Sequence, residues 1–171
     1  MGYRRRGIIV RVLFIRHAAA EDKPPFSGED MARPLTSQGR ADAEAMFKSL
    51  ARIYDKVNAI ITSEAVRARQ TAGILANSLA SARIVVTRHL NPGSDFKAFR
   101  KALSAAGDAQ GPVAVVGHEP DLGRIIGQAV GTAALRIDVK KLCCVEVDMN
   151  TLGKGELKLV LPPAAAEALR R

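Results

Sequence analysis

The stretch IIVRVLFIRHAAAED, residues 8–22, decides how the chain begins to fold. Its apolar and β-branched part, residues 8–15, is typical of a strand that is buried on both faces. The run stops abruptly at Arg16 and His17. An arginine beside a histidine at the carboxyl end of a buried strand has one of two roles. The two are either loop side chains without a chemical role, or they act on an anion. The rest of the sequence decides between these two interpretations.

The chain alternates between apolar runs and segments of helical composition. Further strands are predicted at residues 58–62, 82–87, 112–117, 142–149 and 156–161, and helices at 37–54, 66–80, 95–106 and 121–131. This alternation predicts an α/β fold, a three-layer αβα sandwich with a mostly parallel six-stranded sheet. We expect the first four strands to be parallel, with helices on both faces. The last two strands should form a hairpin-like edge joined by residues 150–155.

The helix predicted at residues 37–54 has apolar residues at three- and four-residue spacing. Thr36 or Ser37 can cap its first turn, because a hydroxyl oxygen accepts from a free backbone N–H there. Gly39 is expected to belong to the entry turn of this helix or to a close packing contact.

Length and composition limit the class of protein. With 171 residues, 47% of them apolar and 25% charged, the chain is predicted to form one domain, residues 1–171. Residues 1–7 are expected to be a flexible basic extension, whose arginine run 4–6 is either solvated or precedes the true start of the protein. The net charge of +9 favours anionic partners. An aromatic content of 4% and the absence of tryptophan argue against nucleic acid as the partner.

The sequence predicts a cytoplasmic protein without a membrane partner. No apolar run is long enough to cross a bilayer, and the first 15 residues lack the apolar core and cleavage site of a secretory signal. Cys143 and Cys144 are adjacent in an apolar run, where a disulfide between them would be strained. We therefore expect both thiols to be reduced.

Cationic and imidazole side chains follow three of the predicted parallel strands. Arg16 and His17 end the first strand, Arg67 lies in the first turn of the helix after the second, and His118 follows the fourth. Binding sites of such sheets lie at the carboxyl ends of the strands. The fixed donors of two arginines and the nitrogens of two histidines suit a phosphoryl group, and helix amino-termini at the same edge add partial positive charge.

Four ordered motifs carry a resemblance to a known family. They read LFIRHAAAED, RPLTSQGRADAEAM, ITSEAVRARQTA and VVGHEPDLG. Together they resemble the histidine phosphatase superfamily, which has a phosphoglycerate mutase-like fold, and within it the SixA-type phosphohistidine phosphatases. The resemblance implies that His17 is the nucleophile that becomes phosphorylated and that Arg16 and Arg67 clamp the phosphoryl oxygens. It also implies that His118 is the second histidine of the phosphate pocket.

The proposed chemistry requires a neutral imidazole at His17. Arg16 and Arg67 should lower the pKa of His17, because two positive charges disfavour a third. If Nδ1 donates to a backbone carbonyl, Nε2 carries the lone pair that attacks phosphorus. The arginines and His118 then stabilise the transferring group by fixed electrostatics, and no metal or other cofactor is expected.

Two features depart from the family pattern. Ala18 stands where the superfamily usually has glycine, and we expect activity to survive this change. No residue matches the carboxylate that protonates the leaving group in larger relatives. Candidate donors are Glu119, which directly follows His118, and the loop residues His89, Glu21 and Asp22, each of which could equally be a solvated side chain. Arg33 either reaches the phosphate or orients its loop.

Three functions follow from these observations. The first is a metal-independent phosphatase with a phosphohistidine intermediate on His17, acting on phosphohistidine of a protein or on a small phosphorylated compound. The second is a phosphoglycerate mutase-like phosphotransferase. The third is a catalytically weak module that binds phosphate or nucleic acid. The sequence has no GxxxxGK[ST] motif, which argues against an ATPase.

Overall fold

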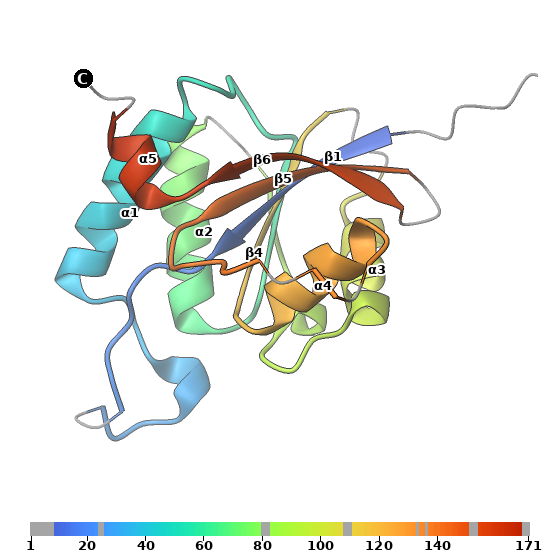
Figure 1. Ribbon diagram of the computed structural model, residues 1–171. Coiled ribbons are helices and arrows are strands. Elements are labelled where there is room, and N and C mark those ends of the chain that lie inside the picture. The colour runs from blue at the N-terminus through green and yellow to red at the C-terminus, as the bar shows by residue number, and fades with distance from the viewer. Residues whose placement is uncertain are drawn as a thin grey trace, which may run out of the picture.

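The computed structural model describes residues 9–23, 26–79, 83–107, 111–132, 134–135, 137–150 and 154–168 (Figure 1). The predicted amino-terminal extension lies outside these residues. The elements, with η for 3₁₀ helices, are β1 (Ile9–Arg16), η1 (Asp30–Ala32), α1 (Ser37–Leu50), β2 (Ala59–Thr62), α2 (Val66–Ser78), β3 (Ile84–Val86), η2 (Arg88–Leu90), α3 (Phe96–Ala105), β4 (Val113–Gly117), α4 (Asp121–Ala129), β5 (Cys144–Asn150), β6 (Gly155–Leu161) and α5 (Pro163–Ala168).

One six-stranded sheet runs through the molecule in the order β3-β2-β4-β1-β5-β6. The first four strands of the sequence pair in parallel, with Arg16 of β1 opposite Gly117 of β4. Strand β5 is antiparallel to β1, and β6 is antiparallel to β5. The predicted α/β fold, with a mostly parallel sheet and an antiparallel edge, is confirmed.

Helices cover both faces of the sheet (Figure 1). Alternate residues of β1 point to opposite faces. Leu13 and Ile15 join the core that α1, α2 and α5 cover, whereas Val12 and Phe14 join the core under α3 and α4. The predicted three-layer arrangement follows from this division. Among the described helices, none combines the length and the apolar character that a membrane span needs.

The start of α1 fixes the loop that follows β1. The Thr36 hydroxyl accepts a hydrogen bond from the Gly39 backbone N–H at 2.9 Å, as the capping prediction required. Gly39 packs so closely against the loop that a Cβ atom there would lie 2.1 Å from the carbonyl oxygen of Ala19. The expected close packing at Gly39 is therefore confirmed, and it places the loop after β1 directly against α1.

Several boundaries differ from the sequence prediction. Helix α1 ends at Leu50 rather than at residue 54, because i→i+3 hydrogen bonds tighten residues 51–53 into a turn. Strand β3 is only three residues long and lies at the sheet edge, and α5, η1 and η2 were not predicted. Cys143 and Cys144 are free and buried, in agreement with the expectation of reduced thiols.

Candidate active site

The parallel strands bring the predicted residues together at one edge of the sheet. Arg16 ends β1, His17 follows it, Arg67 lies in the first turn of α2, and His118 follows β4. They surround a cavity of about 280 Å³, which is lined by Arg16, His17, Ala20, Asp22, Arg33, Arg67, Pro92, His118, Glu119 and Lys141. The four residues that sequence reasoning placed in one site thus line one cavity.

Two contacts determine the tautomer of His17. Its Nδ1 lies 2.7 Å from the carbonyl oxygen of Ala18, which can only accept, so Nδ1 carries the proton. The Nε of Arg67 can only donate, and it lies 3.3 Å from Nε2 of His17. Nε2 therefore carries the lone pair. This is the tautomer that attack on phosphorus requires.

Backbone contacts hold His17 in place. The His17 N–H donates to the carbonyl of Gly117 in β4 at 3.1 Å. The Ala18 N–H donates to the hydroxyl of Thr71, which in turn donates to the carbonyl of Arg67 one helical turn earlier. The same short network thus ties the segment after β1 both to β4 and to the helix that carries Arg67. Ala18 itself is fully buried.

Burial keeps both histidines neutral. The pKa of His17 is lowered to about 4, first by burial and then by the charges of Arg67, Arg16 and Lys141. The pKa of His17 is thus lowered, as the sequence predicted, but burial rather than the arginine pair is the largest cause of the shift. The pKa of His118 is lowered to about 3 by burial, with smaller contributions from His17 and Arg67. The two rings lie 5.0 Å apart between centroids.

Three buried nitrogens of this site have no hydrogen-bond partner among the described residues. They are Nε of Arg16 and both ring nitrogens of His118. Arg16 donates from Nη1 to the carbonyl of Val139 at 3.1 Å, which anchors the guanidinium. Buried polar groups are nearly always paired, so unpaired nitrogens beside a cavity indicate a site for a polar ligand. The cationic side chains of the lining outnumber its carboxylates, which favours an anion as this ligand.

Comparison with known proteins shows the family of the chain. Residues 12–91 match the model of the histidine phosphatase superfamily (branch 1). An uncharacterized protein of Picosynechococcus sp. is 36% identical over 117 residues, which are 67% of this chain and 69% of that protein. The chain belongs to the histidine phosphatase superfamily.

Solved structures of the superfamily share the whole fold. The protein histidine phosphatase SixA, solved with tungstate, is 21% identical with a TM-score of 0.77, covering 90% of this chain and 97% of its own. A SixA protein of Agrobacterium tumefaciens is 25% identical with a TM-score of 0.75, and the match covers 90% of this chain and 98% of that protein. A phosphoglycerate mutase from Bacillus anthracis is 14% identical with a TM-score of 0.71, and the match covers 97% of this chain and 99% of that protein. The likenesses to the tungstate-bound SixA and to the mutase concern the fold alone.

The structure separates the candidate proton donors of this histidine phosphatase. Glu119 and Asp22 line the cavity, whereas Glu21 and His89 are not among its lining residues. Glu119 accepts a hydrogen bond from the Gly123 N–H at 2.8 Å, and burial raises the pKa of its carboxyl group. The carboxyl group best placed to hold a proton near the site is that of Glu119.

Sequence reasoning missed Asp30, which lies in η1 on the loop between β1 and α1. Its carboxylate forms ion pairs with Arg67 at 2.9 Å and with Arg33 at 2.8 Å. The only signal in the sequence is the three-residue spacing between Asp30 and Arg33, and that spacing is common on surfaces. Arg33 lines the cavity and donates from Nη1 to the carbonyl of Glu21, so it both faces the site and orients the loop.

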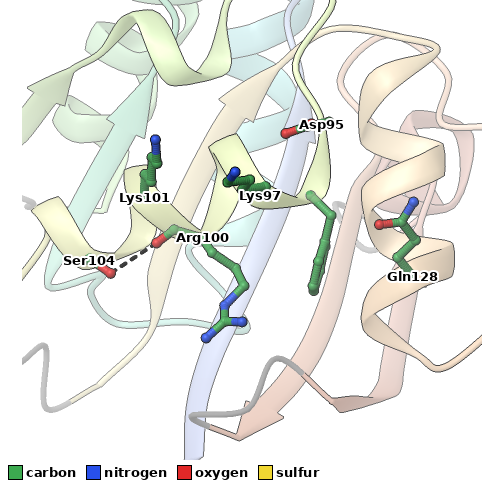
Figure 2. Close-up of a pocket in the computed structure, with 7 residues that line it drawn as sticks. Asp95, Lys97, Arg100, Lys101, Ser104 and Gln128 are labelled. Atoms are coloured by element: carbon green, nitrogen blue, oxygen red, sulfur yellow. Dashed lines mark hydrogen bonds between the residues drawn. The ribbon is translucent and has the colours of Figure 1, made fainter.

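A larger cavity, of about 530 Å³, lies elsewhere, between α3 and α4 (Figure 2). Lys97, Arg100 and Lys101 line it, but none of its lining residues is a histidine or a cysteine that could act as a nucleophile. Within the part of the chain that the structure describes, no three His, Cys, Asp or Glu side chains are grouped to hold a metal ion. The cavity around His17 remains the candidate active site.

Proposed function

We propose that this histidine phosphatase hydrolyses phosphorylated substrates through a phosphohistidine on Nε2 of His17. The unpaired nitrogens of Arg16 and His118 carry this proposal. These unused hydrogen-bonding groups belong to residues that line the same cavity as His17. A phosphoryl group, with three charged oxygens, matches that need better than a carboxylate, which has two.

The first step is attack of the Nε2 lone pair on phosphorus. As the N–P bond forms, the bond between phosphorus and the leaving group breaks, and the leaving group departs with its electron pair. Charge then spreads over the three equatorial oxygens. Arg16, Arg67 and His118 lie around that position and stabilise the charge without reorganising.

Water completes the reaction. Its oxygen attacks phosphorus, the N–P bond breaks, and the electron pair returns to Nε2, while the proton of the water passes to solvent or to a carboxylate of the cavity. The Nδ1 hydrogen bond to the Ala18 carbonyl stabilises the positive charge of the phosphohistidine intermediate. Protein side chains supply all of these steps, so independence from metal ions stays part of the proposal.

The proposed substrate is phosphohistidine on a protein, with a small phosphorylated compound as the second possibility. The likeness to SixA phosphatases supports the first substrate. Phosphohistidine also has a good leaving group, because its imidazole can leave already protonated, and such a substrate does not need a strong acid in the enzyme. A cytoplasmic location stays part of the proposal.

The decisive experiment compares His17→Ala with wild type in hydrolysis of an aryl phosphate and in trapping of the phosphoenzyme. We expect turnover to fall to background and the alkali-stable phosphoenzyme to disappear, while the melting temperature shows that the variant is folded. Arg67→Ala should lower kcat/KM by about 10²- to 10³-fold. The matched control is Arg69→Ala, an exposed arginine on the same helix, which should retain activity. Substantial turnover by folded His17→Ala would contradict the proposal.

A further inference from the structure

We propose that Asp30 is a positioning residue that holds Arg67 and Arg33 as one oriented pair at the phosphoryl site. This inference rests on the proposed phosphatase function. It assigns to the loop between β1 and α1 a part in arranging the site, in addition to closing one side of the cavity.

Every polar nitrogen of the Arg67 side chain has a defined partner. Its Nε donates to Nε2 of His17, Nη1 donates to the backbone carbonyl of Asp30 at 2.6 Å, and Nη2 donates to the Asp30 carboxylate at 2.9 Å. Arg67 is 3% exposed. One residue of the loop therefore fixes both terminal nitrogens, which sets the plane of the guanidinium relative to His17.

The second oxygen of the Asp30 carboxylate holds Arg33. Oδ1 accepts from Nε of Arg33 at 2.9 Å and lies 2.8 Å from its Nη2. The remaining terminal nitrogen of Arg33 donates to the carbonyl of Glu21 at 2.6 Å. Asp30 thus lies between two guanidinium groups and binds one of them with each oxygen.

This arrangement solves two physical problems of an arginine clamp. A long side chain must lose much rotamer freedom before it can stabilise a transition state, and prior positioning removes that loss from the reaction. Two guanidinium groups also repel each other, and a carboxylate between them offsets the repulsion. Burial alone would raise the pKa of Asp30, but its contacts with Arg33 and Arg67 outweigh burial and lower it, so the carboxylate stays charged.

The loop depends on the same contacts. Figure 1 shows the segment between β1 and α1 projecting from the sheet. A bridge between Ala20 and Leu35 joins the two arms of the loop, and the Leu35 N–H donates a hydrogen bond to Gln70 of α2. These contacts lie at the base of the loop. Asp30 is its contact with the catalytic arginine, so placement of η1 and orientation of Arg67 are coupled.

A double-mutant cycle tests this role, because the part of the Asp30 effect that acts through Arg67 disappears when Arg67 is removed. Asp30→Asn, Arg67→Ala and the double variant are compared with wild type in aryl phosphate hydrolysis. We expect Asp30→Asn to lower kcat/KM by about 10- to 100-fold when Arg67 is present. In the Arg67→Ala background the loss should be clearly smaller, because Asp30 then positions only Arg33. The control Glu29→Gln makes the same charge change on the exposed neighbouring residue and should stay within about twofold of wild type.

Titration calorimetry with tungstate supplies a readout that does not need turnover. Asp30→Asn should weaken tungstate binding more in the presence of Arg67 than in its absence. Equal effects in both backgrounds, no effect, or faster hydrolysis when Arg67 is present would overturn the proposal, as would failure of Asp30→Asn to fold. If wild type binds tungstate but hydrolyses no phosphate, the proposed function fails and the binding cycle still decides the role of Asp30. If wild type binds no tungstate, both proposals fail.

Discussion

The protonation of His17 can be measured directly, and its expected value is unusual. The pKa of this histidine lies at about 4, against an ordinary value of 6.5, because burial and then the charges of Arg67 and Arg16 disfavour the cation. One pKa unit corresponds to about 1.4 kcal/mol, so the site favours the neutral imidazole by roughly 3 kcal/mol. At pH 7 only about one molecule in 1,000 should carry a protonated His17.

Two-bond ¹H–¹⁵N spectra recorded between pH 4 and 8 report the state of each ring nitrogen, and loss of the signals in His17→Asn assigns them. We expect the His17 signals to keep the Nδ1–H pattern down to pH 5. Arg67→Met should raise the pKa of His17 but leave it below 6.5, because burial is the largest cause. Titration of wild-type His17 at or above pH 6.5 would refute the reasoning.

Stability should follow the same titration. The unfolded chain binds a proton at His17 near pH 6.5, whereas the folded chain binds it only near pH 4. Between these values the unfolded state holds more protons, so the contribution of His17 to the free energy of unfolding is complete above pH 6.5 and declines as pH falls towards 4. Urea unfolding at pH 7 and pH 5 should show this decline, and it should be smaller in His17→Asn.

Two further predictions concern the site and its support. Tungstate should inhibit hydrolysis of an aryl phosphate competitively and EDTA should not inhibit it, because the cavity binds a phosphoryl-like oxyanion through side chains; inhibition by EDTA that a divalent metal reverses would contradict this. Gly39→Ala should lower the free energy of unfolding by about 2 kcal/mol or more, since its Cβ would meet the Ala19 carbonyl at 2.1 Å. The control Gly73→Ala has nothing within 4 Å of its new Cβ and should be stabilising by about 0.5–1 kcal/mol. Urea unfolding of both variants checks the pair.

The sequence was sufficient to predict the sheet and the grouping of the site residues at one edge of it. Apolar runs mark buried strands, and the rule that carboxyl ends of parallel strands form one edge then placed Arg16, Arg67 and His118 together. The sequence predicts the tautomer of His17 only if a carbonyl oxygen accepts from Nδ1, and the folded structure shows that this carbonyl belongs to Ala18. The relative size of burial and charge in its pKa likewise requires the packing around the ring.

Long-range polar contacts could not be predicted. Asp30 and Arg67 are separated by 37 positions, and their ion pair leaves no periodic pattern in the chain. Glu146 stands in an apolar run of β5, yet it is buried, with the Tyr54 hydroxyl as donor and Arg11 as ion-pair partner. Such groups become visible only when strands and helices are packed. The short helix α5 docks by its buried residue Ala166, which six residues of sequence cannot indicate.

A series of substrates with different leaving groups can identify the residue that donates the proton. Glu119 lines the cavity, and burial raises the pKa of its carboxyl group. Glu119→Gln preserves an oxygen that accepts from the Gly123 N–H and removes only the acid. If Glu119 protonates the leaving group, this variant should slow hydrolysis of alkyl phosphates by about 10²- to 10⁴-fold and leave good leaving groups nearly unaffected.

The measurement is the rate of hydrolysis plotted against leaving-group pKa for wild type, Glu119→Gln and Asp22→Asn. Loss of the acid should make the slope steeper, because a poor leaving group then departs without a proton. A steeper line for Asp22→Asn alone would transfer the role to Asp22. Parallel lines for all three proteins would remove both carboxylates from this step. The enzyme would then depend on substrates whose leaving group arrives protonated, which phosphohistidine satisfies and an alkyl phosphate does not.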